Sequence, residues 1–556
     1  MRSTKSLSLA ALGAGVVLAL SACGGGSSGV TASTSTTAGS LIYNPPARVG
    51  SVTAAAFTAS LQTLPNGQPN TSGQQLLGLL QAAGMLPLPC GIDFHYIQYN
   101  TVGGAGEKTT ASGALMVPTG GTGCSGNRPI LLYAHGTAAT RGYNMANPSD
   151  LTNEGAPESG LVAAMFAAQG YIVVAPNYAG YDSSPLPYHP FLNATALSAD
   201  MINALVAARS ALGHIPAATT LDNGALFLSG YSEGGYVAMA THRAMDVATR
   251  AGTPGLQVVA SAPMSGPYAT EALGDAVVMG QAIDVAGTVF FPLFASGYQN
   301  SFHNVYTTAT DLFALPYANT VPTLMPGPST FTELITQGQV PLALFHNTVW
   351  NTGNATLDSE LDVPNSPLAP FGFGSPFLVT DSFRLQYALD VAASQDGGLT
   401  VAGAPLANPA PTFGFRKDLN ANDMRKGNWF PAAPTLMCGG ANDPEVFFFD
   451  TQIMQAFWAP IAASIPGLPA GFITGLDVDS APTGSDSPAI QAVKAGFAAD
   501  KQAVAAAAAA YAVAHGATDG GAAAAAQAVL LDYHGVLVPP FCTLAARGFF
   551  KTVSGF

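Results

Sequence analysis

ALFLSGYSEGG, at residues Ala225–Gly235, places one serine between an expected strand and an expected helix. The apolar first half predicts a buried strand, and the residues after Gly235 predict a helix, so the chain must turn sharply at Ser232. Gly230 and Gly234 complete the pattern G-x-S-x-G, where a side chain would collide with neighbouring backbone in so tight a turn. Together these features predict a nucleophile elbow, with Ser232 at a helix N-terminus, where negative charge is favoured.

The pattern alone does not identify a catalytic serine, because glycine accounts for 62 of the 556 residues. A second match, at Gly25–Gly29, lies in a Gly/Ser-rich stretch with no strand before it. The context of Ser232 separates the two matches. An ordinary turn between a strand and a helix of a non-catalytic domain is the alternative interpretation.

Strands and helices are expected to alternate around the elbow. The expected strands span 92–100, 109–117, 128–134, 171–176 and 256–263, and the expected helices 161–170 and 196–212. This alternation indicates a mainly parallel sheet with right-handed crossovers and flanking helices. With the elbow, it predicts the α/β class and the α/β-hydrolase fold.

The chain is expected to form a core in two parts, 41–270 and 432–556, separated by an insertion at 271–431. The insertion follows the strand after the elbow helix and is apolar, mostly helical and rich in proline and aromatic residues. It is expected to be a cap or lid over the site, and a plain inserted domain is the alternative. An alanine-rich stretch at 488–531 predicts a helical insertion in the second part, because alanine is the best helix former.

Composition excludes one class of partner. Apolar residues make up 48% of the chain and charged residues only 9%, which indicates a globular protein with ample core and a nearly neutral surface. The net charge of −14 argues against a nucleic-acid partner, whose phosphates require Lys and Arg.

The first forty residues predict export. A basic start is followed by the apolar run Leu7–Leu20, too short to span a bilayer permanently and typical of a signal peptide over 1–22. Leu20–Cys23 resembles a bacterial lipobox, which would make Cys23 the lipidated first residue of a lipoprotein. Cleavage near Ala22 without lipidation is the alternative. Residues 23–40 predict a flexible Gly/Ser/Thr tether to the cell envelope, on its periplasmic or surface side, with the outer membrane as one option.

An activated serine needs a base and a carboxylate that orients the base, in the chain order Ser, acid, His for this fold. His534 lies late in the chain before a glycine and is the expected base, with His515 as the alternative. Asp443 follows an expected strand at 434–440 and is the expected acid. Helix capping by Asp443 is the alternative role, and other acids come after it as candidates, namely Asp450, Asp477 and Asp479.

The oxyanion hole needs two backbone donors. The N–H of Glu233, directly after the nucleophile, is expected to be one. The other is expected from the loop after the strand at 128–134, with Thr137 favoured and Gly136 as the near alternative. His135 is expected to be structural, because it precedes Ser232 in the chain.

Four cysteines remain after Cys23, and an even number in an exported protein suggests two disulfides among three pairings. We favour Cys90–Cys124 and Cys438–Cys542, because the second bond would tie together the loops that carry the acid and the base. The spacings include no C-x-x-C and no histidine cluster, so no metal is expected.

With these residues in hand, the chain resembles the secretory lipase family of α/β-hydrolases, fungal lipases with bacterial relatives. The matching pieces are YAHGT at 133–137, APNYAGY at 175–181, GYSEGG at 230–235, GAND at 440–443 and YHG at 533–535. The resemblance implies ester hydrolysis by a Ser232, Asp443 and His534 triad without a cofactor. Two features differ: Glu233 stands where the fungal enzymes usually carry Gln, and the alanine-rich insertion is unusually long.

The expected function is therefore that of an exported, lipid-anchored serine carboxylic-ester hydrolase, an esterase or lipase that works through an acyl-enzyme. The apolar cap favours a small hydrophobic acyl ester or a polyester as substrate. A serine peptidase of the same fold is the main alternative. A surface binding protein on an inactive hydrolase fold is a more distant one.

Overall fold

The computed structural model describes residues 31–33, 35–64, 66–215, 219–396 and 410–556. The expected signal peptide and Cys23 lie outside these residues, as does the first part of the expected tether. Within the described part of the tether, β1 (Thr31–Ala32) pairs antiparallel with β2 (Tyr43–Asn44).

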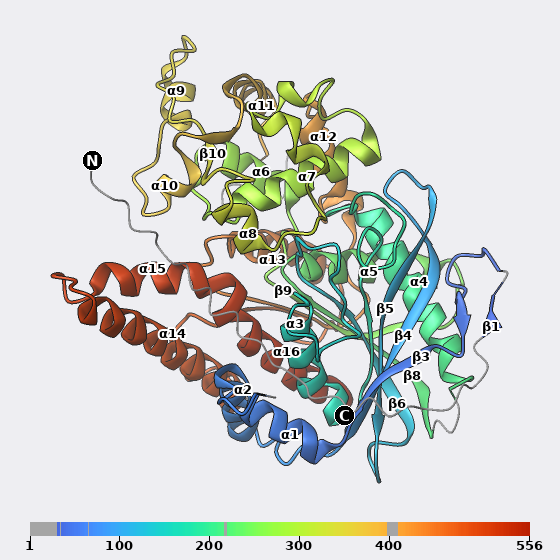
Figure 1. The fold of residues 1–556 in the computed structure, drawn as a ribbon. Helices are drawn as coiled ribbons and strands as arrows, with labels where there is room; N and C mark the ends of the chain where they lie inside the picture. The colour runs from blue at the N-terminus through green and yellow to red at the C-terminus, as the bar shows by residue number, and fades with distance from the viewer. Residues whose placement is uncertain (1–30, 34, 65, 216–218, 397–409) are drawn as a thin grey trace.

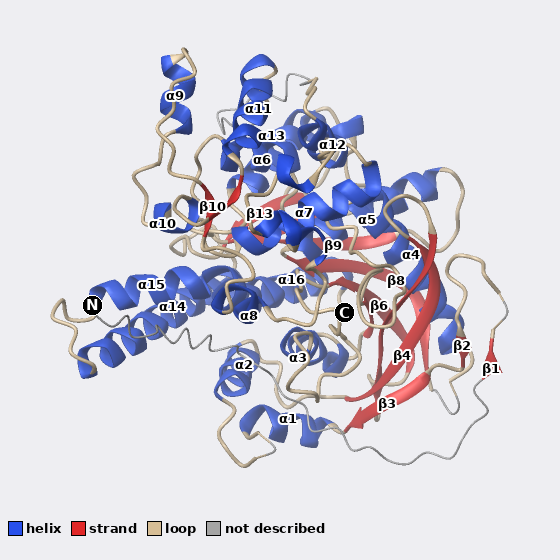
Figure 2. Cartoon of the chain, turned by 45° about the horizontal axis from the view of Figure 1, so that its top comes forward, coloured by secondary structure: helices blue, strands red, loops and turns tan. Residues whose placement is uncertain are grey.

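A nine-stranded sheet forms the centre of the molecule, in the order β13-β12-β9-β8-β6-β7-β5-β4-β3 (Figures 1 and 2). The six strands from β13 to β7 run parallel, and the last three at the other edge pair antiparallel. In chain order the strands are β3 (Ala47–Val52), β4 (Gly91–Val102), β5 (Lys108–Thr119), β6 (Gly126–Ala134), β7 (Ile172–Pro176), β8 (Thr220–Tyr231), β9 (Val258–Met264), β12 (Thr435–Gly439) and β13 (Ile473–Asp477). The predicted α/β-hydrolase class, a mainly parallel sheet flanked by helices, is confirmed.

Helices cover both faces of the sheet. On one face, α4 (Ala194–Leu212) packs against α5 (Glu233–Arg250), which lies on β8 and β9. On the other face, α16 (Val538–Ser554) packs on β9 and β12 beside α3 (Ala156–Met165). Between β3 and β4 in the chain, α1 (Ala54–Gln62) and α2 (Thr71–Ala82) form a helical hairpin. The helix α13 (Phe449–Ala463) packs on β12 and β13.

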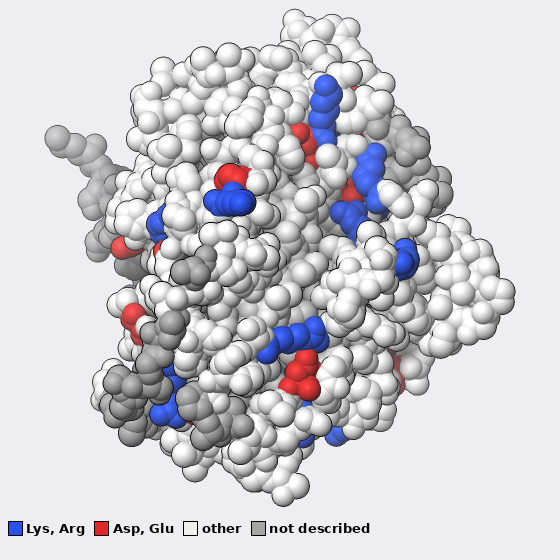
Figure 3. Space-filling view, turned by 90° about the vertical axis from the view of Figure 1, so that its right-hand side faces the viewer, with Lys and Arg blue, Asp and Glu red and all other residues white. Residues whose placement is uncertain are grey.

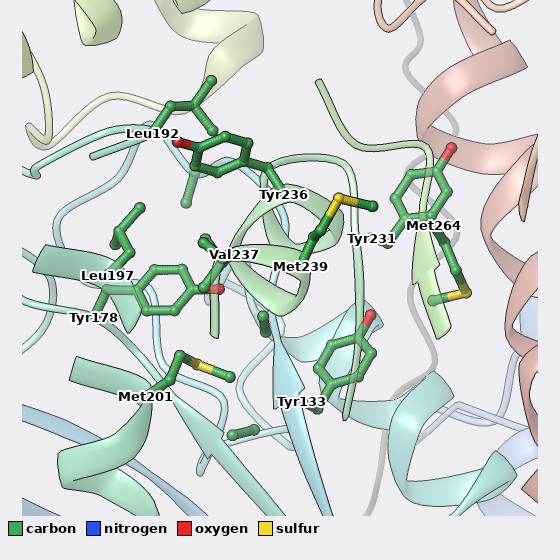
Figure 4. Packing of buried hydrophobic residues seen from close by; sticks show 14 of the residues in the cluster. Tyr133, Tyr178, Leu192, Leu197, Met201, Tyr231, Tyr236, Val237, Met239 and Met264 are labelled. Carbon is green, nitrogen blue, oxygen red and sulfur yellow. The ribbon is translucent and has the colours of Figure 1, made fainter. Parts of the chain in front are cut away.

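Apolar burial fixes the elbow helix. Figure 4 shows Val237 and Met239 of α5 in the same buried cluster as Leu197 and Met201 of α4. Each fully buried side chain of this size contributes about 1.5–3 kcal/mol, so α5 and the serine before it have little freedom to shift. Charged side chains are few and scattered on the face of the molecule that Figure 3 shows.

The segment between β9 and β12 lies above one end of the sheet (Figure 1), and most of its regular elements are helices. Its elements are α6 (Thr270–Val278), α7 (Gly287–Phe302), α8 (Phe331–Thr336), β10 (Ala343–Phe345), α9 (Ala355–Leu361), α10 (Ala369–Gly372), β11 (Phe377–Val379), α11 (Asp381–Ala393) and α12 (Gly414–Asn422). Phe415 of α12 makes ring contacts with Phe291 of α7 and Phe383 of α11. Buried Arg416 forms ion pairs with Asp275 of α6 and with Asp390 of α11, so ionic contacts as well as apolar ones join these helices.

The alanine-rich stretch is helical, forming α14 (Pro488–Ala514) and α15 (Ala522–Asp532), which pack side by side and project from the body (Figure 1). A π-helical turn, Tyr533–Leu537, then leads into α16. The run Ala522–Ser554 is long and apolar enough to cross a membrane by length and composition alone. We interpret it as part of the globular body, because α16 packs on the sheet and the run carries the buried His534.

Candidate active site

The elbow has the backbone that its sequence predicts. Ser232 follows the last residue of β8 and has φ 58° and ψ −125°, a conformation that costs a non-glycine residue free energy. Its N–H donates to the carbonyl of Met264 on β9, at 3.0 Å, which helps to hold the turn. A Cβ on Gly230 would overlap the carbonyl of Gly234, and one on Gly234 would overlap the carbonyl of Ala134. Only glycine fits at both positions.

Three side chains from distant parts of the chain meet at this turn. Ser232 Oγ lies 2.8 Å from His534 Nε2, and His534 Nδ1 lies 2.7 Å from Asp443 Oδ2. All three residues are buried, with His534 only 4% exposed. The Tyr231 hydroxyl donates to the carbonyl of His534 at 2.6 Å, which ties the π-helical turn to the end of β8. The distances are those that proton transfer from the serine to an oriented imidazole requires.

The Asp443 carboxylate caps the turns that follow it and also contacts His534. Its Oδ1 accepts from the backbone N–H groups of Glu445 and Val446, each at 3.0 Å, as a cap of the following turns does. That leaves Oδ2 directed at His534. Capping therefore fixes the carboxylate in the orientation in which it can hold the imidazole.

The competing acids and the competing histidine lie elsewhere. Asp450 accepts from the N–H of Ala269 at 2.9 Å, and His515 is exposed and stacked on Tyr511 at the end of α14. Asp477 accepts from the N–H of Ala441, and Asp479 from the Tyr533 hydroxyl. These last two acids support the segments that carry Asp443 and His534.

The segments that carry Asp443 and His534 are also joined covalently. A disulfide links Cys438, at the end of β12, to Cys542 in α16, and a second links Cys90 to Cys124. These are the two pairings that the sequence favours. In the Cys438–Cys542 bond, Cys438 lies a few residues before Asp443, and Cys542 lies a few residues after His534.

Backbone donors near the serine differ in whether they are occupied. The N–H of Gly136 donates to both carboxylate oxygens of Glu158, at 3.1 and 3.2 Å. Within the described part of the chain, the N–H groups of Thr137 and Glu233 have no acceptor. Both residues line the space at Ser232, so they can donate to a developing oxyanion while Gly136 cannot without losing Glu158.

His135 is structural. Its ring is fully buried and stacked between Tyr143 and Tyr178, with centroids 4.2 and 4.1 Å away. Burial lowers the pKa of His135 to about 3, so the ring stays neutral. It packs the loop that presents Thr137.

A histidine that sequence reasoning missed lies beneath the elbow. His189 Nε2 is 2.6 Å from Glu233 Oε1, and both side chains are fully buried. His189 Nδ1 lies 3.0 Å from the carbonyl oxygen of Ala179, which can only accept, so Nδ1 carries a proton. The close contact between the ring and Glu233 must then hold a second proton, shared by the pair. The signal was an acid at position 233, since a buried carboxyl needs a partner.

A carboxyl pair that the sequence did not single out lies beside the imidazole. Glu445 Oε2 is 4.0 Å from His534 Nε2, and Glu445 hydrogen-bonds to Asp284. Burial raises the pKa of Asp284 to about 6, and burial together with Asp284 raises the pKa of Glu445 well above its usual range. Two such neighbouring carboxyls hold a proton between them, because both cannot ionise cheaply in so little water.

Two cavities meet at Ser232, and Thr137, Phe290 and Glu445 line both. The first, here called the acyl pocket, has an empty volume of about 750 Å³ and extends among α6, α7 and α12. Its walls are almost wholly apolar and include Leu273, Val277, Ile283, Phe291 and Phe415.

The second cavity, here called the alcohol groove, has an empty volume of about 1540 Å³, including its open mouth. It passes His534 and the residues after it, and its walls come from α2, α3 and α14. The described residues include no group of three or more His, Cys, Asp or Glu placed to hold a metal ion.

Comparison with known proteins gives structural neighbours only. No family model matches the chain, and no curated protein matches it in sequence. A ligand-bound form of the rice cell wall degrading esterase LipA from Xanthomonas oryzae is similar at a TM-score of 0.61 and 24% identity, over 92% of this chain and 98% of that one. A mutant form of the same esterase is similar at 0.58 and 25% identity, over 82% and 93%. The chain therefore has the α/β-hydrolase fold. Its structural neighbours support the predicted resemblance to secretory lipases and esterases.

Proposed function

We propose that this protein is a serine carboxylic-ester hydrolase, an esterase or lipase that works through an acyl-enzyme. The observation that carries the proposal is the chain of contacts from Ser232 to His534 to Asp443, at 2.8 and 2.7 Å, where two cavities meet. An ordinary turn between a strand and a helix has no reason to bring a buried imidazole and carboxylate to its serine.

In the proposed reaction, Ser232 Oγ attacks the ester carbonyl while His534 Nε2 takes the hydroxyl proton. The oxyanion accepts hydrogen bonds from the N–H groups of Glu233 and Thr137. Collapse breaks the bond to the alcohol oxygen, which leaves with the proton from His534. Water then attacks the acyl-enzyme, gives a proton to His534, and releases the carboxylic acid as the serine recovers its proton. Asp443 holds the imidazole and stabilises its charged form throughout.

The position of His534 indicates which cavity holds the acyl part of the ester and which holds the alcohol part. The leaving oxygen must reach His534 Nε2, and this residue lines the alcohol groove but not the acyl pocket. The alcohol part of the ester therefore occupies the groove, and the acyl part enters the apolar pocket. An apolar pocket of this kind suits a hydrophobic acyl chain or the repeat of a hydrophobic polyester. The segment 271–431 then acts as a cap, because it supplies more than half of the residues that line the acyl pocket.

Export and anchoring complete the proposal. Two disulfides favour an oxidising compartment outside the cytosol. Removal of residues 1–22 and lipidation of Cys23 would tether the body, the core parts 41–270 and 432–556, to the cell envelope. Labelling of intact cells with a radioactive fatty acid should mark the protein, and Cys23→Ser should abolish the label. Label that persists in Cys23→Ser would rule out this anchor.

Matched chromogenic substrates test the activity. We expect p-nitrophenyl butyrate to be hydrolysed, an aminoacyl-nitroanilide to be left intact, and Ser232→Ala to lose turnover while keeping its circular dichroism. Cleavage of the nitroanilide alone would favour a serine peptidase of the same fold. Failure of both substrates in well-folded protein would favour a binding protein. No cofactor is expected, so activity should survive dialysis against a chelator.

A further inference from the structure

The alcohol groove differs in chemistry from the acyl pocket. Four carboxyl side chains line it, and none of its described lining residues is Lys or Arg. The carboxyls come from four places in the chain, namely Glu154, Glu158, Glu445 and Asp500. Each is partly exposed to the groove. Apolar side chains such as Leu76, Leu79 and Val504 form the rest of the wall. The groove can therefore take a hydrocarbon frame, but it offers no cation to an anionic group.

Two of the carboxyls are already occupied. Glu154 accepts from the N–H and the hydroxyl of Thr140, at 2.9 and 2.7 Å. Glu158 accepts from the hydroxyls of Tyr133 and Tyr143, each at 2.8 Å, and from the N–H of Gly136. These two acids build the wall of the groove and hold the chain on both sides of Thr137, at Gly136 and at Thr140.

The other two carboxyls retain capacity for a ligand. Asp500, on α14, forms no hydrogen bond or ion pair with any described residue. Glu445 bonds to Asp284 and lies beside His534, so one of its oxygens borders the place where the leaving oxygen must sit. Burial raises the pKa of Asp500 as well as that of Glu445. Ionised carboxylates are thus poorly solvated here, and a further anion would be less favourable still.

We propose that the alcohol groove selects esters whose alcohol part carries hydrogen-bond donors, as hydroxyl or ammonium groups, and rejects esters whose alcohol part is anionic. Glu445 and Asp500 are the specificity-determining residues. Donors on the alcohol would meet acceptors that have few or no other partners, whereas an anion would meet like charge and no counter-charge. The inference rests on the proposed ester hydrolysis. It also gives the alanine-rich insertion a role, since α14 supplies Asp500.

Four butyrate esters of para-substituted phenols test the selection. The substituents are methyl, hydroxymethyl, aminomethyl and carboxymethyl. In all four a saturated carbon is bonded to the ring, which keeps the reactivity of the phenol ester nearly constant. Alkaline hydrolysis rates correct for what difference remains, and chromatography of the released phenols gives kcat/KM. We expect the carboxymethyl ester to react roughly tenfold more slowly than the methyl ester, and the two donor-bearing esters faster than the methyl ester.

Charge reversal in the groove separates a local contact from the overall field. In Asp500→Lys, the ratio of kcat/KM for the carboxymethyl ester to that for the methyl ester should rise by roughly fivefold, the size expected where solvent partly screens a charge pair. Glu360→Lys makes the same change in net charge at an exposed position of α9, outside both cavities, and should leave the ratio unchanged. Glu445→Gln should reduce the advantage of the donor-bearing esters.

The outcomes are distinct. Equal kcat/KM for the carboxymethyl and methyl esters, or equal shifts in Asp500→Lys and Glu360→Lys, would overturn the selection and leave ester hydrolysis standing. If none of the four esters is hydrolysed by folded protein, the proposed function itself fails.

Discussion

Replacing His189 with leucine would leave the Glu233 carboxyl without its partner directly behind the nucleophile. The two side chains are fully buried and 2.6 Å apart, and Glu233 Oε2 has no hydrogen-bond partner among the described residues. Removing one member of a buried charged pair typically costs about 3–5 kcal/mol, because the other charge stays in a poorly solvated place. We therefore expect His189→Leu to lower the free energy of unfolding by about this amount.

A kinetic effect should accompany the loss of stability. The backbone N–H of Glu233 is one of the two proposed oxyanion donors. The side chain of the same residue is held by His189. Loss of one such donor costs about 10²–10³ in kcat, so a shift of this backbone should lower kcat by up to about a hundredfold. KM for p-nitrophenyl butyrate should change little, because the donor acts mainly in the transition state.

The conservative variant Glu233→Gln is the matched control. Its amide N–H can donate to Nε2 of a neutral His189 while Nδ1 still donates to Ala179, so folding and kcat should stay near the wild-type values. The double variant His189→Leu/Glu233→Leu removes both polar groups and should recover much of the lost stability. Equilibrium unfolding in urea and steady-state kinetics measure both effects. Wild-type stability and kcat in His189→Leu would refute a positioning role for His189.

Three further changes probe the rest of the site. Asp443→Asn should lower kcat by about 10⁴ with the fold intact, because the base loses its orienting carboxylate; a loss within tenfold in steady-state assays would contradict that role. Replacing both cysteines of the Cys438–Cys542 bond with alanine should cost about 2–5 kcal/mol of stability and lower kcat more than the same change at Cys90–Cys124 does. Equal kcat in the two variants would show that the first bond does not hold the site. Burial raises the pKa of Asp284, beside Glu445, from 3.8 to about 6. The folded state thus binds more protons than the unfolded state between these values, and its stability should fall as pH rises from 4 to 6. Asp284→Asn should flatten this fall in urea titrations at pH 4, 5 and 6, and an unchanged fall would contradict the assignment.

Local chemistry allowed the sheet and the elbow to be predicted. An apolar run, two glycines and a helix leave few alternatives for the backbone around Ser232, and the fold sets the chain order of acid and base. Strand ends were harder. β8 begins at Thr220, in polar sequence, because Thr220–Asp222 pairs with Gly126–Arg128 of β6, and such pairing leaves no apolar signal.

The Cys438–Cys542 bond could be predicted, but other contacts between distant loops could not. The choice between Thr137 and Gly136 depends on Glu158, which occupies the Gly136 N–H from a neighbouring helix. His189 reaches Glu233 from a loop 44 residues earlier, and no periodicity in the sequence marks that approach. The Asp284–Glu445 pair joins the segment after β9 to the loop after β12 in the same way.

Covalent labelling tests the central claim most directly. A fluorophosphonate reacts only with a serine whose hydroxyl is activated by a base, so digestion and mass spectrometry of the labelled protein identify the nucleophile. We expect one adduct, on Ser232, with the extent of labelling matching the loss of esterase activity and with no adduct in Ser232→Ala. Labelling at another serine, or full esterase activity in Ser232→Ala, would contradict the account.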